Sequence, residues 1–448
     1  MFKRSLIAGV AVAALMAPFS AQAQRAGENA VTSAEDSFGS SIGDQNVGLY
    51  SDTSARGFSP VQAGNIRLDG LYFDQQFNLG GRIDGGTTMR VGLSAQSYPF
   101  PAPTGIADVT LRRPGDTTVG SLSLARQAYG GQQAEADIVT PLIPGKLGMV
   151  ASLAGARNHY DWRGTFKNVV FSGALDWAPS DTVNVYAFVQ GMEGIDGEAQ
   201  PLMFTAGVYT PPKYDRSIYF GQWWADRNRS VRNFGALINA EPADGWRFRA
   251  GLFRSVNDLK EDTIAFFRNV QPDGAAQFDI VRSQPQFAAS TSGEARLTRV
   301  IAEGPRLHTF HLAAKGRSVY RRFGGSQTIP MGPAQIGVYR ELPEPIYNLG
   351  PTSDDDVFQI TPGIAYIGRW LEVGEFSAGI QKSFYTATCS SPTCPKRRPA
   401  AGRGSITRPL RSTFRPMRRY TRATPADSRN PVSRPRTPTT AAKPCPRA

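Results

Sequence analysis

Residues 168–190 read NVVFSGALDWAPSDTVNVYAFVQ, and this stretch decides which kind of fold the chain has. Alternate positions of its first half place these residues on one face: Val169, Phe171, Gly173, Leu175 and Trp177. After a short turn at 178–181, the faces are Val183, Val185, Ala187 and Val189 against Asn184, Tyr186, Phe188 and Gln190. Because side chains in a strand alternate between two faces, this period of two predicts a pair of antiparallel strands.

The same design recurs downstream at 231–252, 297–314 and 358–385. Each pair has a short turn at one end, whereas long polar connections are expected at 253–294 and 315–357. Short turns on one side, long loops on the other and strands of about ten residues are typical of an outer-membrane β-barrel. A sheet can cross lipid only when it closes, because every backbone group must be paired within the protein.

Two further observations favour a membrane barrel over a soluble β-sandwich, whose strands also alternate. Trp177 and Trp246 stand beside short turns, where a membrane-interface girdle would place them. Loops of about 40 residues are unusual in compact soluble domains, whose connections are mostly much shorter.

Charge is unevenly distributed along the chain. The formal net charge is +13, from 50 Lys and Arg against 37 Asp and Glu. Residues 386–448 hold 15 of those basic residues, one of the acidic ones and 11 of the 33 prolines. The remainder therefore has a net charge of −1, and its partners cannot be inferred from the overall basic character. All three cysteines lie at 386–448 too, so the body has no disulfide, thiolate metal site or cysteine nucleophile.

Residues 386–448 have two interpretations. As written, they predict a disordered basic tail, and a secreted nucleic-acid-binding protein would rest on this tail alone. The second interpretation is a shifted reading frame, because synonymous codons permit an alternating, strand-like sequence in the shifted frame. We favour the shifted reading frame. The chain is then expected to have no nucleic-acid partner, and its barrel is expected to be truncated at about ten strands. Two unpaired edges would then prevent insertion and uptake.

The N-terminus has the pattern of a secretory signal peptide at 1–23. Lys3 and Arg4 precede an apolar run at 6–16, and small residues at 21 and 23 supply a cleavage pattern. The apolar run is shorter than the roughly 20 residues that span a bilayer. The chain is therefore expected to be exported in a Gram-negative cell.

Residues 24–115 are rich in Gly, Ser and Asp and predict a compact α/β domain. Strands are expected at 66–73 and 87–93, and the proline-rich stretch 98–103 must be a loop.

Three segments of this region carry a family resemblance: 48–50, 55–60 (ARGFSP) and 63–73 (AGNIRLDGLYF). They resemble, in order and spacing, the plug of TonB-dependent outer-membrane receptors, and 88–109 is similar to that family's second plug element. The resemblance implies a mainly β protein, a transmembrane antiparallel β-barrel (here incomplete) with an N-terminal α/β plug. The expected domains are a signal peptide at 1–23, a plug at 24–115, a partial barrel at 116–385 and the tail at 386–448.

The resemblance also implies the activity. Such receptors take up a ferric siderophore or a similarly scarce, bulky ligand across the outer membrane, driven by the TonB complex and without enzyme chemistry or a cofactor. Plug arginines that bond carboxylates of the barrel wall are expected at Arg56, Arg67, Arg90 and Arg112. The plug motif itself comprises Gly57, Phe58, Gly64, Asn65, Asp69 and Gly70. A passive porin-like barrel or an adhesin is the alternative, and energy-dependent uptake would distinguish it.

Other clusters do not predict a catalytic or metal site. His308 and His311 fall on opposite faces of a strand because an odd separation reverses the side chain. The acidic run 354–356 is expected to be solvated, and Trp223 and Trp224 to be interface aromatics. No nucleophile elbow, P-loop or paired-carboxylate motif is present in the sequence.

Overall fold

The structure is a computed structural model that describes residues 59–80, 82–90, 100, 105–162, 164–198, 200–371 and 373–390. It also gives the backbone of short strands at 39–41, 50–51, 54–55, 406–407 and 410–411. The predicted signal peptide and the plug residues Arg56, Gly57 and Phe58 lie outside the described residues.

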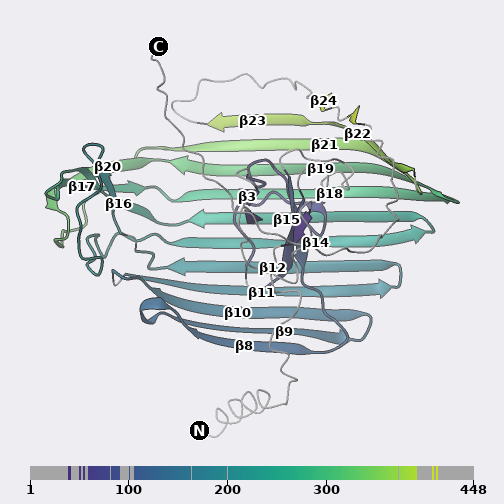
Figure 1. Cartoon of the computed structure of the whole chain (residues 1–448), viewed down its shortest axis with the longest axis horizontal. Coiled ribbons are helices and arrows are strands. Elements are labelled where there is room, and N and C mark those ends of the chain that lie inside the picture. The colour runs from purple at the N-terminus through teal and green to yellow at the C-terminus, as the bar shows by residue number, and fades with distance from the viewer. Residues whose placement is uncertain are drawn as a thin grey trace, which may run out of the picture.

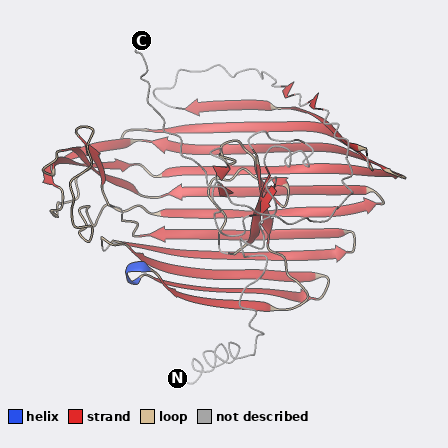
Figure 2. Cartoon of the chain, viewed as in Figure 1, coloured by secondary structure: helices blue, strands red, loops and turns tan. Residues whose placement is uncertain are grey.

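One broad antiparallel sheet dominates the molecule, with successive strands side by side (Figures 1 and 2). From one edge to the other, its main strands are β8 (Val119–Arg126), β9 (Gln132–Ile143), β10 (Leu147–His159), β11 (Thr165–Ser180), β12 (Val183–Ile195), β14 (Arg229–Ala243), β15 (Trp246–Leu259), β18 (Gln286–Glu303), β19 (Arg306–Gly324), β21 (Thr352–Trp370) and β22 (Gly374–Lys382). Also in this sheet are β23 (Phe384–Ser390), which pairs with β21, and β24 (Ile406–Thr407) and β25 (Leu410–Arg411), which pair with β22. We call this sheet the wall.

The wall has the hairpins that the alternation predicts. Met149 pairs with Leu175, and Leu175 pairs with Ala187, so the quoted stretch 168–190 forms adjacent strands β11 and β12. Val169, Leu175 and Trp177 are exposed on the outward face, whereas Tyr186 and Phe188 are buried on the inward face. This alternation matches a barrel wall with a lipid side and an inner side.

A smaller mixed sheet lies against the inward face of the wall, in front of it in Figure 1. Its strands are β1 (Gly39–Ser41), β4 (Ile66–Leu68), β5 (Leu71–Tyr72), β6 (Asp84–Arg90) and β7 (Ile106–Leu111), while β2 (Tyr50–Ser51) and β3 (Ser54–Ala55) pair separately. We call the described residues 59–115 the plug. They contain strands and turns and no helix among them, so the α/β expectation is met there only in its β part.

One predicted strand of the plug is in fact two. The alternation at 66–73 predicts a single strand, but β4 ends at Leu68 and β5 begins at Leu71. Between them Asp69 and Gly70 have φ angles of 45° and 77°, a left-handed pair that reverses the chain as a tight hairpin turn. The Asp-Gly dipeptide is the strongest local signal for such a turn, and the alternation on either side masked it.

The plug and the wall share one hydrophobic core. Leu68, Leu71 and Phe73 of the plug cluster with Phe188 and Phe253 of the wall. The rings of Phe73 and Phe253 meet edge to face with centroids 5.8 Å apart. Such aromatic pairs stabilise beyond the area they bury, so the plug is packed onto the wall as one layer on another.

The long connections that the sequence predicts as polar loops are largely strands. Three of these strands, β16 (Asp262–Val270), β17 (Ala275–Ser283) and β20 (Ser326–Gln335), form a four-stranded sheet with β13 (Leu202–Thr205). We call this sheet the outer lobe. It lies at the end of the wall opposite the short turns (Figure 1). Phe220, Phe267 and Phe278 are part of its own core.

The loop prediction was wrong for two reasons. The apolar residues of β16 and β17, which contribute to the outer-lobe core, were not recognised as strands, and the ends of β19 and β21 are polar on both faces. Strands β19 and β21 each have 19 residues, longer than the roughly 9–11 that a membrane strand needs. Where a strand emerges into water, neither face needs to be apolar, so alternation fades while backbone pairing continues.

Other described features are minor. A single turn of 3-10 helix, η3 (Ala128–Gly130), joins β8 to β9. Within the described ranges, no helix is long and apolar enough to cross a membrane. Strand β23 reaches Ser390, five residues beyond the predicted end of the barrel region at 385.

Candidate functional site

The interface between the plug and the wall gathers most of the buried charge of the protein. It is built by inward-facing positions of the wall strands, which present polar and charged side chains at every second residue. On the inward face of β18 these are Ser290, Ser292, Glu294, Arg296 and Thr298. Because the plug covers this face, Ser292, Glu294 and Arg296 bond to the plug instead of to water.

The Asp69–Gly70 turn is one centre of this interface. The carbonyl of Asp69 accepts a hydrogen bond from Arg249 of β15, and the carbonyl of Gly70 accepts one from Arg296 of β18 at 3.1 Å. A side chain at position 70 would meet the Arg249 guanidinium at 3.4 Å, in a left-handed conformation that favours glycine. The turn is therefore shaped so that two wall arginines reach its backbone.

A third arginine, Arg113, holds the turn from the plug side. Arg113 lies 2.7 Å from the carboxylate of Asp69, 3.2 Å from Asp176 of β11 and 3.0 Å from the Asn184 amide oxygen. Burial by itself lowers the pKa of Arg113, but Asp69 and Asp176 outweigh it and raise that pKa above its usual value. This guanidinium stays charged and links the turn to the wall.

The extended segment after β5 is bonded to wall side chains at every second backbone N–H. The N–H of Tyr72 donates to Glu294 at 3.1 Å, that of Asp74 to Ser292 at 2.8 Å, and that of Gln76 to Ser255 at 2.9 Å. The period of two reflects an extended chain whose alternate N–H groups face the wall.

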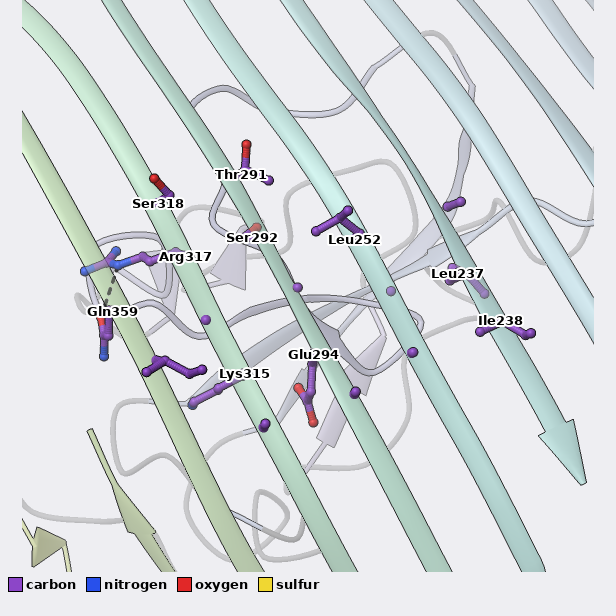
Figure 3. Close-up of a pocket in the computed structure, with 18 of the residues that line it drawn as sticks. Leu237, Ile238, Leu252, Thr291, Ser292, Glu294, Lys315, Arg317, Ser318 and Gln359 are labelled. Atoms are coloured by element: carbon purple, nitrogen blue, oxygen red, sulfur yellow. Dashed lines mark hydrogen bonds between the residues drawn. The ribbon is translucent and has the colours of Figure 1, made fainter. Parts of the chain in front are cut away.

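Side chains reinforce this ladder. Arg317 of β19 forms an ion pair with Asp74 at 2.8 Å, and the Tyr72 ring lies between Arg67 and Lys315, at 5.3 and 5.5 Å. Burial, and then the nearby Asp74 carboxylate, raises the pKa of Tyr72, so its hydroxyl stays neutral. Figure 3 views these strands from outside: Glu294, Lys315 and Arg317 belong to inward positions, in front of the plug ribbon.

The third contact joins the plug to the first wall strands. Arg112 forms an ion pair with Asp137 of β9 at 3.1 Å, with side chains only 8% and 0% exposed. Arg82 pairs with Glu135 at 2.6 Å, and the Tyr186 hydroxyl donates to the Arg112 carbonyl at 2.8 Å. Removing one partner of such a buried pair leaves an uncompensated charge, which costs about 3–5 kcal/mol.

The residues singled out from the sequence fall in different places. Arg112 contacts a wall carboxylate, whereas Arg67 donates to the carbonyls of Gly64 and Ile66 within the plug. Arg90 ends β6, where it pairs with Ile106 of β7.

The motif residues are mostly internal to the plug. The N–H of Asn65 donates to the Pro60 carbonyl at 2.8 Å, closing the turn at Gly64 (φ 66°). Asp69 and Gly70 alone among the described motif residues bond to the wall in the contacts given above.

The sequence reasoning missed most of the interface. The missed plug residues are Asp74, Arg82 and Arg113; the missed wall residues are Glu135, Asp137, Asp176, Arg249, Glu294, Arg296 and Arg317. A usable signal was present, because charged residues at alternate positions of a barrel strand mark its inward face. Glu294 and Arg296, two residues apart, illustrate it.

The histidines remain apart. His308 Nδ1 lies 2.7 Å from the Tyr366 hydroxyl, and His311 Nδ1 lies 2.9 Å from the Thr298 hydroxyl. Throughout the part of the chain that the structure describes, no group of three or more His, Cys, Asp or Glu is placed to hold a metal ion.

A long antiparallel wall with an inward-packed plug defines the class of plugged outer-membrane barrels. No protein-family model and no curated protein sequence matches this chain. Solved structures match its fold, which is that of TonB-dependent siderophore receptors.

Three of these structures illustrate the match. FpvA of Pseudomonas aeruginosa, solved with heterologous pyoverdines, aligns over 79% of this chain and 48% of its own at 16% identity and a TM-score of 0.63. BauA, the ferric preacinetobactin receptor of Acinetobacter baumannii, aligns over 77% and 52% at 15% identity and 0.60. The Escherichia coli ferric-catecholate receptor Fiu, in its closed form, aligns over 78% and 54% at 12% identity and 0.60. The chain thus spans about half the length of the receptors it matches.

Proposed function

We propose that this chain belongs to a TonB-dependent receptor that takes up a ferric siderophore, or a similarly bulky and scarce ligand, across the outer membrane. The observation that carries the proposal is the plug bonded to the inward face of the wall. The ladder from Tyr72 to Gln76 is its clearest part. The ligand class is supported by two matched proteins: FpvA is solved with pyoverdines and iron, and BauA is a ferric preacinetobactin receptor.

The nature of the plug contacts supports gated transport. The wall accepts the backbone N–H groups of Tyr72, Asp74 and Gln76 through side-chain oxygens, not through a second backbone. Side-chain acceptors can rotate away one at a time, whereas the hydrogen bonds between two paired backbones must break together along the strand. A pull transmitted by the TonB complex would therefore release this segment stepwise and open a path along the wall.

A reversible lock tests the proposal. Asp74→Cys and Ser292→Cys would bridge the ladder at its closest step, where the Asp74 N–H lies 2.8 Å from the Ser292 hydroxyl. The described body has no cysteine of its own before Cys389, so the new pair has no nearby competitor. In a receptor whose barrel is closed, we expect uptake of iron-loaded siderophores to stop when the pair is oxidised and to resume after reduction.

The controls separate gated transport from a passive pore. Each single cysteine variant should transport equally under oxidising and reducing conditions. Uptake should also disappear in cells without TonB or treated with a protonophore. Uptake that persists in the oxidised double variant, or in cells without TonB, would show that the plug does not need to move and would favour a passive barrel.

A further inference from the structure

The outward face of the wall carries an apolar groove that the plug contacts leave unused. It has a volume of about 690 Å³ and lies across β15, β18, β19, β21 and β22, near the short-turn end. Leu312 and Ile364 are 58% exposed within it. We call it the rim groove.

Strand register divides the rim groove into two rows. The deeper row is apolar, formed by direct partners Leu297, Leu312, Ile364 and Ile380. The row one step nearer the turns is amphipathic, formed by Trp246, Arg299, Phe310, Tyr366 and Ala378. An apolar floor beneath a basic and aromatic edge matches the profile of a lipid, with acyl chain and headgroup in the same order.

Arg299 is the cation at this edge. Its guanidinium lies over the Trp246 ring, 5.2 Å from the centroid, and donates to the Asp244 carbonyl at 2.5 Å. No carboxylate lies within ion-pair distance of Arg299 in the described part of the chain, although other rim arginines have one: Arg369 pairs with Glu375 at 2.7 Å. Arg299 is thus an arginine held in place, with donors left for an anion.

We propose that the rim groove binds a glycerophospholipid of the inner leaflet, with its anionic phosphate on Arg299 and one acyl chain along Leu297, Leu312 and Ile364. The inference rests on the proposed membrane placement and requires the wall to insert despite its two unpaired edges. The short turns of such barrels face the periplasm, so this end of the wall meets the phospholipid leaflet. Lipopolysaccharide would instead meet the end that carries the outer lobe.

The test uses the full chain refolded into vesicles of phosphatidylethanolamine and phosphatidylglycerol at about three to one, matching a mixed neutral and anionic leaflet. Insertion is scored by protease protection of the wall. The same sample is then transferred to mild detergent, and retained lipids are counted by native mass spectrometry. We expect one retained phospholipid, enriched in phosphatidylglycerol.

Two variants and two matched controls decide the outcome. Arg299→Gln should lower retention about fivefold, which corresponds to ~1 kcal/mol for one basic contact. Ala378→Phe should lower it by filling the groove. Arg369→Gln removes an equal charge at the same rim but from an inward position, and Ala236→Phe fills the neighbouring outward groove shown in Figure 3; both should retain lipid as the parent does.

Three contrary results would have different consequences. A failure of the parent chain to insert would overturn the membrane placement and this inference with it. Insertion with equal lipid retention in all five proteins would overturn the lipid site alone. A preference for added lipopolysaccharide over phospholipid, lost in Arg299→Gln, would overturn the assigned occupant.

Discussion

The ion pair between Arg112 and Asp137 makes the sharpest prediction about how the plug is held. The two groups lie 3.1 Å apart, 8% and 0% exposed, and Arg82 approaches the same carboxylate at 3.9 Å. Replacing Asp137 with Asn keeps the shape of the side chain but removes its charge. The Arg112 guanidinium is then left buried beside a neutral amide, for which we expect a loss of ~3 kcal/mol, the lower part of the range for a broken buried pair.

The assay is hydrogen exchange of the plug N–H groups that donate to the wall. Those of Tyr72, Asp74 and Gln76 donate to Glu294, Ser292 and Ser255, so their exchange reports opening of the plug from the wall. A loss of ~3 kcal/mol should speed that exchange roughly a hundredfold. Glu241→Gln serves as the control, because the Arg247–Glu241 pair is about 60% exposed and worth at most ~1 kcal/mol.

A double replacement completes the experiment. Arg112→Met with Asp137→Leu removes both charges and replaces them with apolar side chains, so most of the lost protection should return. Exchange in Asp137→Asn that equals the parent's would refute the reasoning, since the pair would then contribute nothing to plug docking. A double variant as labile as the single one would show that shape, not charge, holds this contact.

Three other outcomes follow from the same contacts. Phe253→Ala, at a side chain with no exposure that meets Phe73, should cost about 3–5 kcal/mol of plug docking by exchange, whereas an effect below ~1 kcal/mol would contradict the shared core. Tyr186→Phe removes the bond to the Arg112 carbonyl and should cost ~1 kcal/mol in the same assay; no change would mean that this bond is dispensable. Burial, and then the carboxylates of Asp196, Glu261 and Glu198, raises the pKa of Asp226 beside the outer lobe from 3.8 to about 6. Because the folded state holds this proton more tightly than the unfolded state does, the stability due to Asp226 is complete below about pH 4. That stability is lost as the pH rises through 6. The urea midpoint of outer-lobe unfolding, followed by tryptophan fluorescence, should therefore be higher at pH 5 than at pH 7.5, and Asp226→Asn should remove the difference; a midpoint that rises with pH would refute it.

Local pattern was enough to predict the hairpins of the wall from 168 onward, but it did not predict β8, β9 and β10. Within a hairpin the two strands follow each other in the sequence, and each inward or outward position follows from parity within one strand. The alternation of 168–190 is therefore the same information as the hairpin of β11 and β12. Trp177 is exposed on the outward face and Tyr186 is buried on the inward face, as their positions in the alternation predict.

Local pattern failed where chemistry changes along one strand. The polar ends of β19 and β21, at the end of the wall that carries the outer lobe, were predicted as loop because both of their faces meet water there. The Asp69–Gly70 turn was hidden by alternation that continues across it. The strand ends depend on partners that lie far away in the sequence, whereas the turn carried a local signal, the Asp-Gly dipeptide, that was overlooked.

The sequence by itself determined that this chain builds a membrane-type antiparallel wall, because period-two patterning and turn spacing are properties of neighbouring residues. The plug before it was inferred from a family resemblance, not from patterning. Only the tertiary structure decided which charges meet. Tyr72 and Glu294 are 222 residues apart and Asp74 and Arg317 are 243 apart, yet each pair is in contact. Nothing in either local sequence specifies its partner, since the pairing depends on where the plug docks against the wall. That docking is set by the shared core of both layers.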